Sequence, residues 1–238
     1  MIQGRLRQQT QTKAESAGSL AFRQRPDSTD SHGPPLSERG HIARTIKRAF
    51  DLVIALVALV VLAPLMLLIA LLVRADSPGP VLFRSLRVGR DGEPLRMLKF
   101  RTMVEGADGQ RDALRHLSDA TGGLFKIADD PRVTRLGRYL RATSLDELPQ
   151  LFHVLSGKMS LVGPRPLPPE EDVLLEGSGW RLHARPGVTG PWQVAGSWQV
   201  GLTEMVRLDN EYLANWTLWS DVKLLLFTVV HVFQRRGA

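Results

Sequence analysis

The run Ala49–Val73 contains 25 residues, of which only Asp51 is charged, and it has a proline, Pro64, near its centre. About 20 apolar residues are enough to cross the hydrocarbon core of a bilayer. A proline inside a helix removes one backbone hydrogen bond and kinks or breaks the helix. The sequence therefore predicts a membrane element that bends at Pro64, followed by a polar part that works at a membrane surface.

The charges on both sides of this run bear on its topology. The flanks Pro34–Arg48 and Arg74–Arg90 each contain four Lys or Arg residues and one acidic residue. Flanks rich in Lys and Arg stay on the cytoplasmic side of a membrane. Two such flanks predict a re-entrant helix that enters the bilayer, bends and returns to the same face. An ordinary kinked span is the alternative, because prolines also occur in transmembrane helices.

Composition divides the chain into three parts. The net charge is +7, and residues Met1–Arg48 hold nine Lys or Arg against four acidic residues, so most of the excess lies ahead of the apolar run. Segments with few large apolar residues stay unfolded. We predict a disordered basic tail at 1–40, a re-entrant membrane helix at 41–75 and one polar domain at 76–238. The absence of cysteine excludes disulfides and thiolate chemistry.

The polar domain is predicted to be α+β and mostly helical. Two alternating segments, Val81–Val88 and Pro94–Met103, flank Asp91-Gly92, which is a type I′ turn signal, and together they predict a β-hairpin. Helices are expected from apolar spacing, and the last of them has the composition of an interfacial amphipathic helix. The expected helices are Thr134–Arg141, Leu145–Leu155, Leu202–Tyr212 and Trp216–Arg236.

The adjacent acids Asp146 and Glu147 admit two interpretations. Ser144 and Glu147 match a capping box, and acidic residues suit the first turn of a helix, so the pair is explained by capping alone. A helix start also attracts phosphate. There an ionised aspartate can attack phosphorus, and a neighbouring glutamate can hold Mg²⁺ together with phosphate oxygens. From these residues alone, capping is the better explanation of the pair.

Cationic side chains that suit phosphate recognition accompany this pair. Lys99 and Arg101 share one face of the second hairpin strand. Arg165 stands between two prolines that stiffen its backbone, and rigid guanidinium groups suit phosphate. Arg141 and Arg185 are further candidates, the latter just before a Pro-Gly turn. Solvation is the ordinary state of any single arginine, so this set is suggestive only as a group.

Five motifs in order resemble the bacterial sugar transferase family, the monotopic polyprenyl-phosphate phosphoglycosyl transferases. The resemblance extends from about Arg44 to Arg236 and favours catalysis over capping for Asp146. The motifs are Lys99–Met103, Asp130–Gly137, Thr143–Leu151, Met159–Pro166 and Arg185–Gly190.

The resemblance implies an enzyme with a two-step mechanism. Asp146 would attack the β-phosphate of a UDP-sugar and release UMP, and polyprenyl phosphate would then take the sugar phosphate from the enzyme. Glu147 would bind Mg²⁺, the one cofactor implied, and assist proton transfer. Pro64 would bend the membrane helix. Five cations would bind substrate phosphates: Lys99, Arg101, Arg141, Arg165 and Arg185.

The resemblance also implies partners and a location. The expected partners are a UDP-sugar, polyprenyl (undecaprenyl) phosphate and the lipid bilayer, at the cytoplasmic face of the bacterial inner membrane. Homo-oligomerisation stays open. The segment Glu105–Phe125 is similar to exopolysaccharide-type members that use hexoses, which favours glucose or galactose 1-phosphate. Ala63 departs from the serine that often precedes the proline in this family, and it lacks a hydroxyl to bond the freed backbone groups.

Two other functions fit parts of the sequence. A membrane-tethered nucleic-acid binder is suggested by the sequence pI of 10.3. It should show a basic stripe interleaved with aromatic residues in the domain. The excess charge lies in the tail instead and aromatic content is 6%, so no nucleic acid is expected. An inactive membrane scaffold is the second alternative, and it requires Asp146 to be dispensable.

Overall fold

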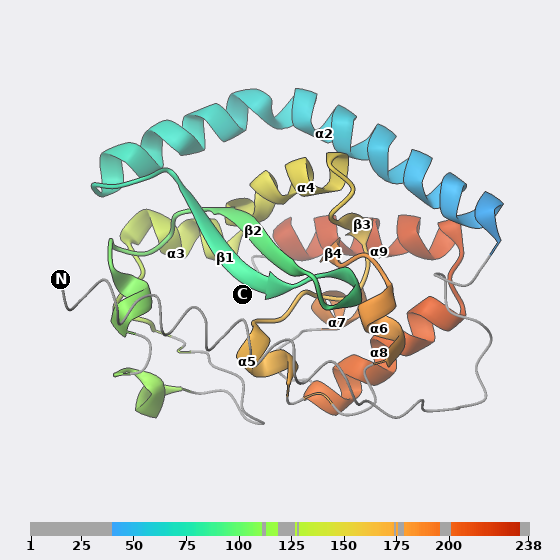
Figure 1. Cartoon of the computed structure of the whole chain (residues 1–238). Coiled ribbons are helices and arrows are strands. Elements are labelled where there is room, and N and C mark those ends of the chain that lie inside the picture. Colours follow the sequence, from blue (N-terminus) through green and yellow to red (C-terminus); the bar gives the residue numbers. More distant parts are fainter. Residues whose placement is uncertain are drawn as a thin grey trace.

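The computed structural model describes residues 40–110, 113–118, 127, 129–173, 175, 179–195 and 201–233. Except for Gly40, the predicted tail lies outside these ranges, as do Phe125 and Lys126 near the motif Asp130–Gly137. The described part is mostly helical with two small sheets (Figure 1), which confirms the predicted α+β class.

One long helix, α2, is followed by a series of short elements. The helix α2 is His41–Asp76. The strands are β1 Leu82–Val88, β2 Pro94–Phe100, β3 Ser160–Val162 and β4 Gly187–Thr189. The shorter helices are α3 Arg135–Ala142, α4 Leu151–Leu155, α5 Pro169–Asp172, α6 Gly179–His183, α7 Pro191–Val194, α8 Leu202–Ala214 and α9 Leu218–Phe233. Single 3₁₀ turns are η1 Arg90–Gly92, η2 Ala107–Gln110, η3 Arg115–Leu117 and η4 Leu145–Gln150.

Helix α2 passes through Pro64 without interruption. Figure 1 shows it arching over the hairpin, α4 and α9, which lie beneath its concave side. The structure therefore shows one continuous arched helix in place of two helical arms, and the return of the chain to the same membrane face stays a prediction. Proline is a common cause of such curvature. It has no amide hydrogen, so the carbonyl of the residue four positions earlier receives no helical hydrogen bond.

The two sides of α2 differ in exposure. Its concave side is buried at Ala55, Ile69 and Val73. Among the residues that the structure describes, α2 alone is long and apolar enough to cross a membrane. An apolar face of this size on a soluble monomer is unusual and marks an interaction surface. The large apolar side chains exposed on α2 are Ile42, Ile46, Val53, Ile54, Leu56, Val57, Val60, Val61, Leu67, Leu68, Leu71 and Leu72.

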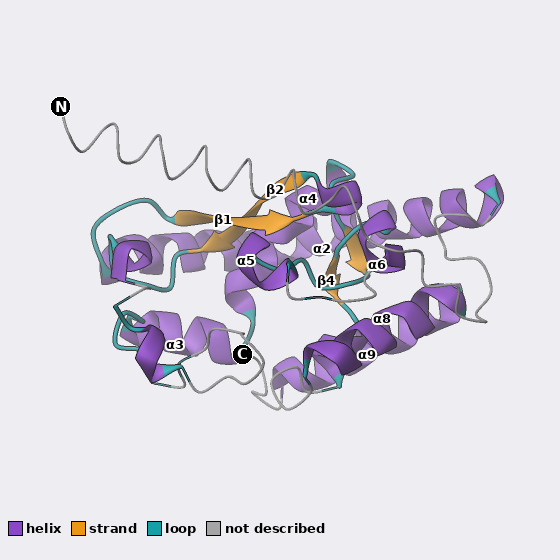
Figure 2. Ribbon diagram, turned by 60° about the horizontal axis from the view of Figure 1, so that its bottom comes forward, coloured by secondary structure: helices purple, strands orange, loops and turns teal. Residues whose placement is uncertain are grey.

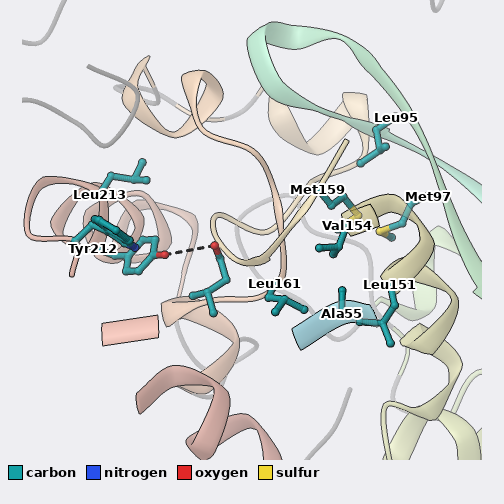
Figure 3. Close-up of a cluster of buried hydrophobic side chains, with 11 residues drawn as sticks. Ala55, Leu95, Met97, Leu151, Val154, Met159, Leu161, Tyr212 and Leu213 are labelled. Carbon is teal, nitrogen blue, oxygen red and sulfur yellow. Dashed lines mark hydrogen bonds between the residues drawn. The ribbon is translucent and has the colours of Figure 1, made fainter. Parts of the chain in front are cut away.

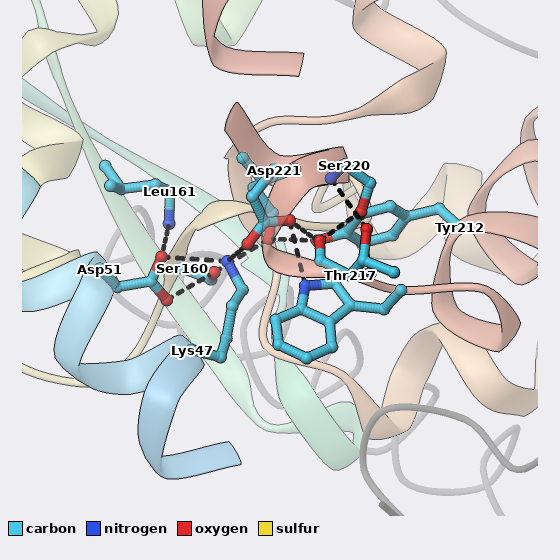
Figure 4. A network of polar contacts seen from close by, with 10 residues as sticks. Lys47, Asp51, Ser160, Leu161, Tyr212, Thr217, Ser220 and Asp221 are labelled. Atoms are coloured by element: carbon cyan, nitrogen blue, oxygen red, sulfur yellow. Dashed lines mark hydrogen bonds and ion pairs between the residues drawn. The ribbon is translucent and has the colours of Figure 1, made fainter. Parts of the chain in front are cut away.

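A buried polar network fastens the first part of α2 to the domain (Figure 4). The Lys47 ammonium lies 3.0 Å from Asp51 Oδ1 and 2.8 Å from Asp221 Oδ2. Ser160 Oγ donates to Asp51 Oδ2 at 2.8 Å, and the Tyr212 hydroxyl donates to Asp221 Oδ1 at 2.6 Å. The one charge in the apolar run is thus paired with Lys47 on α2 and hydrogen-bonded by Ser160 on β3, and Lys47 also links α2 to Asp221 on α9.

The hairpin agrees with its prediction. Strands β1 and β2 are antiparallel, in register from Leu82 opposite Phe100 to Val88 opposite Pro94. Asp91 and Gly92 have positive φ angles of 57° and 82°, and the Glu93 amide donates to the Arg90 carbonyl at 3.1 Å. Positive φ at both central residues is what a type I′ turn requires.

A short parallel sheet brings two of the five motifs together. Strand β3 pairs with β4, with Ser160 opposite Gly187 and Val162 opposite Thr189. A Cβ atom on Gly163 would lie 2.5 Å from the Arg185 carbonyl, so only glycine permits this approach. Figure 2 shows this sheet between the β1–β2 hairpin and the pair α8–α9. The segment 163–168 after β3 is thereby placed beside the chain before β4.

The largest apolar cluster lies where α2, β2, α4 and β3 meet, with α8 completing it (Figure 3). Burial of these side chains supplies the main stabilisation, about 25 cal/mol for each Å² of apolar surface removed from water. The cluster also fixes α4, and with it the segment that leads into α4. Its members are Ala55, Leu95, Met97, Leu151, Val154, Met159, Leu161, Val162, Tyr212, Leu213 and Trp216.

Three predicted helices occur with small changes in bounds, namely α3, α8 and α9. Thr134 caps α3, because its Oγ1 accepts the Gly137 amide at 2.9 Å. Helix α9 exposes Trp219, Leu226 and Phe227 on one side. An interfacial position of α9 therefore stays a prediction with an apolar face to support it.

Candidate active site

The acidic pair lies on η4, a 3₁₀ turn, and not in the first turn of a long helix. Ser144 adopts a left-handed conformation, with φ 53° and ψ 17°, and its side chain makes no capping hydrogen bond. The predicted capping box is therefore wrong, whereas the predicted helix Leu145–Leu155 occurs as the 3₁₀ segment η4 followed directly by α4. A non-glycine residue in this region costs about 1–3 kcal/mol and such residues cluster at functional sites.

Two leucines hold η4 in place on either side of the acids. Leu145 and Leu148 pack against a cluster in which Ile69 and Val73 of α2 meet Phe100 of β2. The turn is thus fixed between the long apolar helix and the hairpin. Asp146 and Glu147, which lie between these two leucines, are thereby placed near Lys99 and Arg165 from two of the other motifs.

Asp146 is a buried carboxylate, only 6% exposed. It forms no hydrogen bond with any residue that the structure describes. Burial raises the pKa of Asp146 to about 6, although the charges of Lys99, Arg141 and Arg165 act to lower it. A carboxylate with this pKa is mostly ionised at neutral pH, and it is more basic than an exposed aspartate.

Glu147 has the opposite environment. Lys99 Nζ lies 2.6 Å from its Oε1, and Arg165 Nη2 lies 3.5 Å from the same oxygen. Burial acts to raise the pKa of Glu147, but the charges of Lys99 and Arg165 outweigh it and lower the pKa to about 2. Adjacent carboxylates with pKa values moved apart are typical of sites where two acids have different roles.

Lys99 reaches the site because β2 packs on η4 and α4. The Leu98 amide, next to it on β2, donates to His153 Nε2 on α4 at 3.0 Å. Burial lowers the pKa of His153, which agrees with a neutral ring that accepts this bond. This contact gives His153 a structural role. No sequence pattern predicts that His153 anchors β2, because its partner Leu98 is 55 residues away in sequence.

Arg141 is held by the close approach of α3 to the end of the hairpin. A Cβ on Gly137 would lie 2.1 Å from the Thr102 carbonyl, so this glycine allows the contact. Arg141 Nε donates to Thr102 Oγ1 at 2.9 Å. Burial lowers the pKa of Arg141, and the nearby charge of Asp146 opposes this shift.

The motif ahead of α3 has a structural role. Asp130 and Arg132 form a buried two-point pair, with Nε at 2.9 Å from Oδ1 and Nη2 at 2.6 Å from Oδ2. Hydrogen bonding by Arg132 lowers the pKa of Asp130. Arg132 Nη1 also donates to the Ala107 carbonyl at 3.1 Å. These bonds order the segment that leads into α3 and so support Arg141.

Two of the five predicted phosphate ligands lie elsewhere. Arg101 Nη2 donates to the carbonyls of Val73, at 3.2 Å, and Ser77, at 2.6 Å. The buried guanidinium of Arg101 thus caps the end of α2, and its phosphate role stays a prediction. Arg185 Nε donates to the Gly157 carbonyl at 3.0 Å, and its charged neighbours are Arg48, Arg90 and Asp51. A phosphate role for Arg185 stays a prediction.

The site therefore brings together two acids, Asp146 and Glu147, and three cations, Lys99, Arg141 and Arg165. Its donor set fits a Mg²⁺ ion bound mainly through phosphate and water oxygens, since Mg²⁺ needs only one or two protein carboxylates in such sites. Glu147 Oε1 is engaged by the two cations, whereas Oε2 receives no hydrogen bond from the described residues. No cluster of three or more potential metal-ligating side chains occurs among the described residues.

The described part of the chain thus combines a long apolar helix, a small α+β domain and a buried acid among cations. The chain belongs to the bacterial sugar transferase family, which it matches over residues 42–235. This result confirms the resemblance seen in the five motifs.

Several curated relatives are similar over most of this chain. The undecaprenyl-phosphate galactose phosphotransferase of Salmonella typhimurium is 41% identical over 204 residues, which cover 82% of this chain and 42% of that protein. The UDP-glucose:undecaprenyl-phosphate glucose-1-phosphate transferase of Escherichia coli is 38% identical over 207 residues, 83% of this chain and 42% of that protein. The exopolysaccharide production protein ExoY of Rhizobium meliloti is 39% identical over 197 residues, 81% and 87% respectively. The chain thus spans about two fifths of the longer relatives and most of ExoY.

Proposed function

We propose that this chain transfers a hexose 1-phosphate, glucose or galactose, from a UDP-sugar to undecaprenyl phosphate and releases UMP. The observation that carries this proposal is the buried carboxylate of Asp146, which lacks a hydrogen bond from the described residues and lies among Lys99, Arg141 and Arg165. The names of the relatives support the donor and acceptor, because they are galactose and glucose phosphate transferases to undecaprenyl phosphate. The product would begin the assembly of an exopolysaccharide or another glycoconjugate.

In the first step, a carboxylate oxygen of Asp146 forms a bond to the β-phosphorus of the UDP-sugar. The bond from that phosphorus to the oxygen bridging the two phosphates breaks, and UMP leaves. The raised pKa of Asp146 makes it a better nucleophile than an exposed aspartate, and it is still ionised at neutral pH. Arg141 and Arg165 offset the repulsion between this carboxylate and the phosphates.

In the second step, a phosphate oxygen of undecaprenyl phosphate attacks the phosphorus of the aspartyl-phosphosugar. The bond to Asp146 breaks, which regenerates the carboxylate and yields undecaprenyl diphosphate hexose. Lys99 keeps Glu147 ionised throughout, since their atoms are 2.6 Å apart. The second oxygen of Glu147, Oε2, is then available to bind a metal ion.

Mg²⁺ is proposed as the cofactor, with Glu147 as its protein ligand and the substrate diphosphate supplying further oxygens. When bound, the ion would neutralise charge that develops on the phosphate oxygens.

We further propose that α2 is re-entrant and lies with its convex apolar face in the cytoplasmic leaflet of the inner membrane. The arch of α2 (Figure 1) and the positive flanks at both ends support this orientation. Its concave side packs on the domain through Ala55, Ile69 and Val73, so the domain would lie on the cytoplasmic side. The exposed apolar side of α9 would rest at the membrane interface.

The test uses purified protein in detergent with Mg²⁺, a panel of UDP-sugars and undecaprenyl phosphate. We expect UMP release with UDP-glucose or UDP-galactose. Without the lipid acceptor, intact mass measurement should show a hexose phosphate bound to the wild-type chain and none on Asp146→Asn. Asp129→Asn is the matched control, because that side chain is 94% exposed. Absence of UMP release with every sugar, or full turnover by Asp146→Asn, would contradict the proposal.

A further inference from the structure

Arg181, on α6, is a buried arginine that lies outside the five motifs. Its side chain is 3% exposed. Nε donates to Asp209 Oδ2 at 3.2 Å and Nη1 donates to Asp172 Oδ1 at 3.3 Å. Its remaining nitrogen, Nη2, donates to the backbone carbonyl of Arg165 at 2.6 Å. One guanidinium group thus joins α5 and α8 to the segment that carries a cation of the candidate active site.

The backbone of this segment is held mainly through its carbonyl groups. Prolines 164, 166 and 168 have no amide hydrogen to donate. The Pro164 carbonyl accepts the Gly187 amide at 2.9 Å, and the Leu167 carbonyl accepts the Val88 amide at 2.8 Å. Between these two points, the Arg165 carbonyl is held by the Arg181 side chain. Of these three contacts, only the bond from Arg181 to the Arg165 carbonyl involves a side chain, so only this bond can be removed by a substitution.

We infer that Arg181 is a positioning residue that places Arg165 against Glu147 and the substrate diphosphate. The inference rests on the proposed function. Asp172 and Asp209 orient the guanidinium, and its third arm then fixes the Arg165 backbone. A planar guanidinium can serve three partners at once, whereas a lysine ammonium is a compact point charge on a shorter reach. Arg181→Lys should keep the buried positive charge but lose the bond to Arg165.

The first experiment measures UMP release by Arg181→Lys with a saturating UDP-sugar. Small misplacement of a catalytic group costs up to about 100-fold in rate, so we expect a loss of about 10- to 100-fold. Arg207→Lys is the matched control, because Arg207 on α8 also pairs with two acids, Glu204 and Glu211, but is 59% exposed. We expect wild-type rates from that control. A rate for Arg181→Lys equal to that of the control would overturn the inference.

A double variant separates positioning from general damage to the fold. If Arg181 acts through Arg165, the substitution Arg181→Lys should reduce activity little further in an Arg165→Ala background. Residues that act as one unit are strongly non-additive. A loss that multiplies fully in the double variant would show that Arg181 acts by another route and would overturn the inference.

A readout without turnover keeps this test independent of the proposed function. Amide hydrogen exchange at Val88 and Gly187 reports on the 163–168 segment, because both amides donate to its carbonyls. We expect faster exchange at these two amides in Arg181→Lys and unchanged exchange in Arg207→Lys. Unchanged exchange in Arg181→Lys would overturn the inference. If the wild-type protein released no UMP, the proposed function would fail, and the exchange data would still decide the position of the segment.

Discussion

The substitution Asp146→Asn is expected to abolish turnover and at the same time stabilise the fold. The pKa of this carboxyl is about 6 in the folded protein, against an ordinary value of 3.8. Each pKa unit corresponds to about 1.4 kcal/mol, so ionised Asp146 lowers the free energy of unfolding by about 3 kcal/mol. Asparagine has no charge to bury. The gain is at most this size, because the amide also loses its contact with water.

The pH dependence of this gain follows from the direction of the shift. The folded state binds the proton of Asp146 more tightly than the unfolded state, because its pKa is the higher one. The destabilisation is therefore absent below about pH 3.8, grows as the pH rises to about 6 and is complete above that. The advantage of Asp146→Asn should be full at pH 8 and small at pH 4.5.

Thermal unfolding of the purified protein in detergent is the assay. For a chain of this size, about 3 kcal/mol corresponds to a rise in Tm of roughly 6–12 °C. Asp129→Asn, at a side chain 94% exposed, should leave Tm unchanged. If Asp146→Asn lowered Tm at pH 8, or raised it equally at both pH values, the argument that burial of the charge determines the pKa would be refuted.

Further predictions concern the site and its supports. The rate of UMP release should fall as the pH drops below about 6, because protonated Asp146 is not nucleophilic. Lys99→Gln should move the midpoint of that pH–rate profile upward, since the Lys99 charge lowers the pKa of Asp146. Ser144→Val should destabilise the fold by about 1–3 kcal/mol in denaturant titrations, whereas Ser144→Gly should not, because only glycine adopts a positive φ freely. Lys47→Met should cost about 3–5 kcal/mol by the same measurement, because it leaves two buried carboxylates without their cation.

Local chemistry made part of the fold predictable. The hairpin follows from strand alternation around Asp91-Gly92, and α3 follows from its apolar spacing. The long apolar helix follows from composition alone. In each of these cases the element is stabilised by residues that are neighbours in sequence. The local sequence pattern is therefore enough to predict it.

The remaining features depend on residues that are far apart in sequence. Ser144 matches a capping signature, yet packing of Leu145 and Leu148 on α2 and β2 favours a 3₁₀ turn instead. Pro64 bends α2 without reversing it, because the domain packs along the concave side on both sides of the proline.

The candidate site was predictable only in part for the same reason. The motifs predicted Asp146, Lys99 and Arg165 as site residues, and the structure places these three residues together. Arg101 has the same strand parity as Lys99, but the end of α2 captures its guanidinium. Arg181 was missed because its partners lie on α5, α8 and the 163–168 segment, which no local pattern connects.

The polar network at the start of α2 has a consequence for biosynthesis. Lys47 and Asp51 are translated well before Asp221, which lies 2.8 Å from Lys47 in the folded chain. Until Asp221 has been translated, Lys47 can pair with Asp51 alone, and the ion pair between α2 and α9 is missing. The packing of α2 on the domain is thus completed only after synthesis of α9, which supplies this second carboxylate.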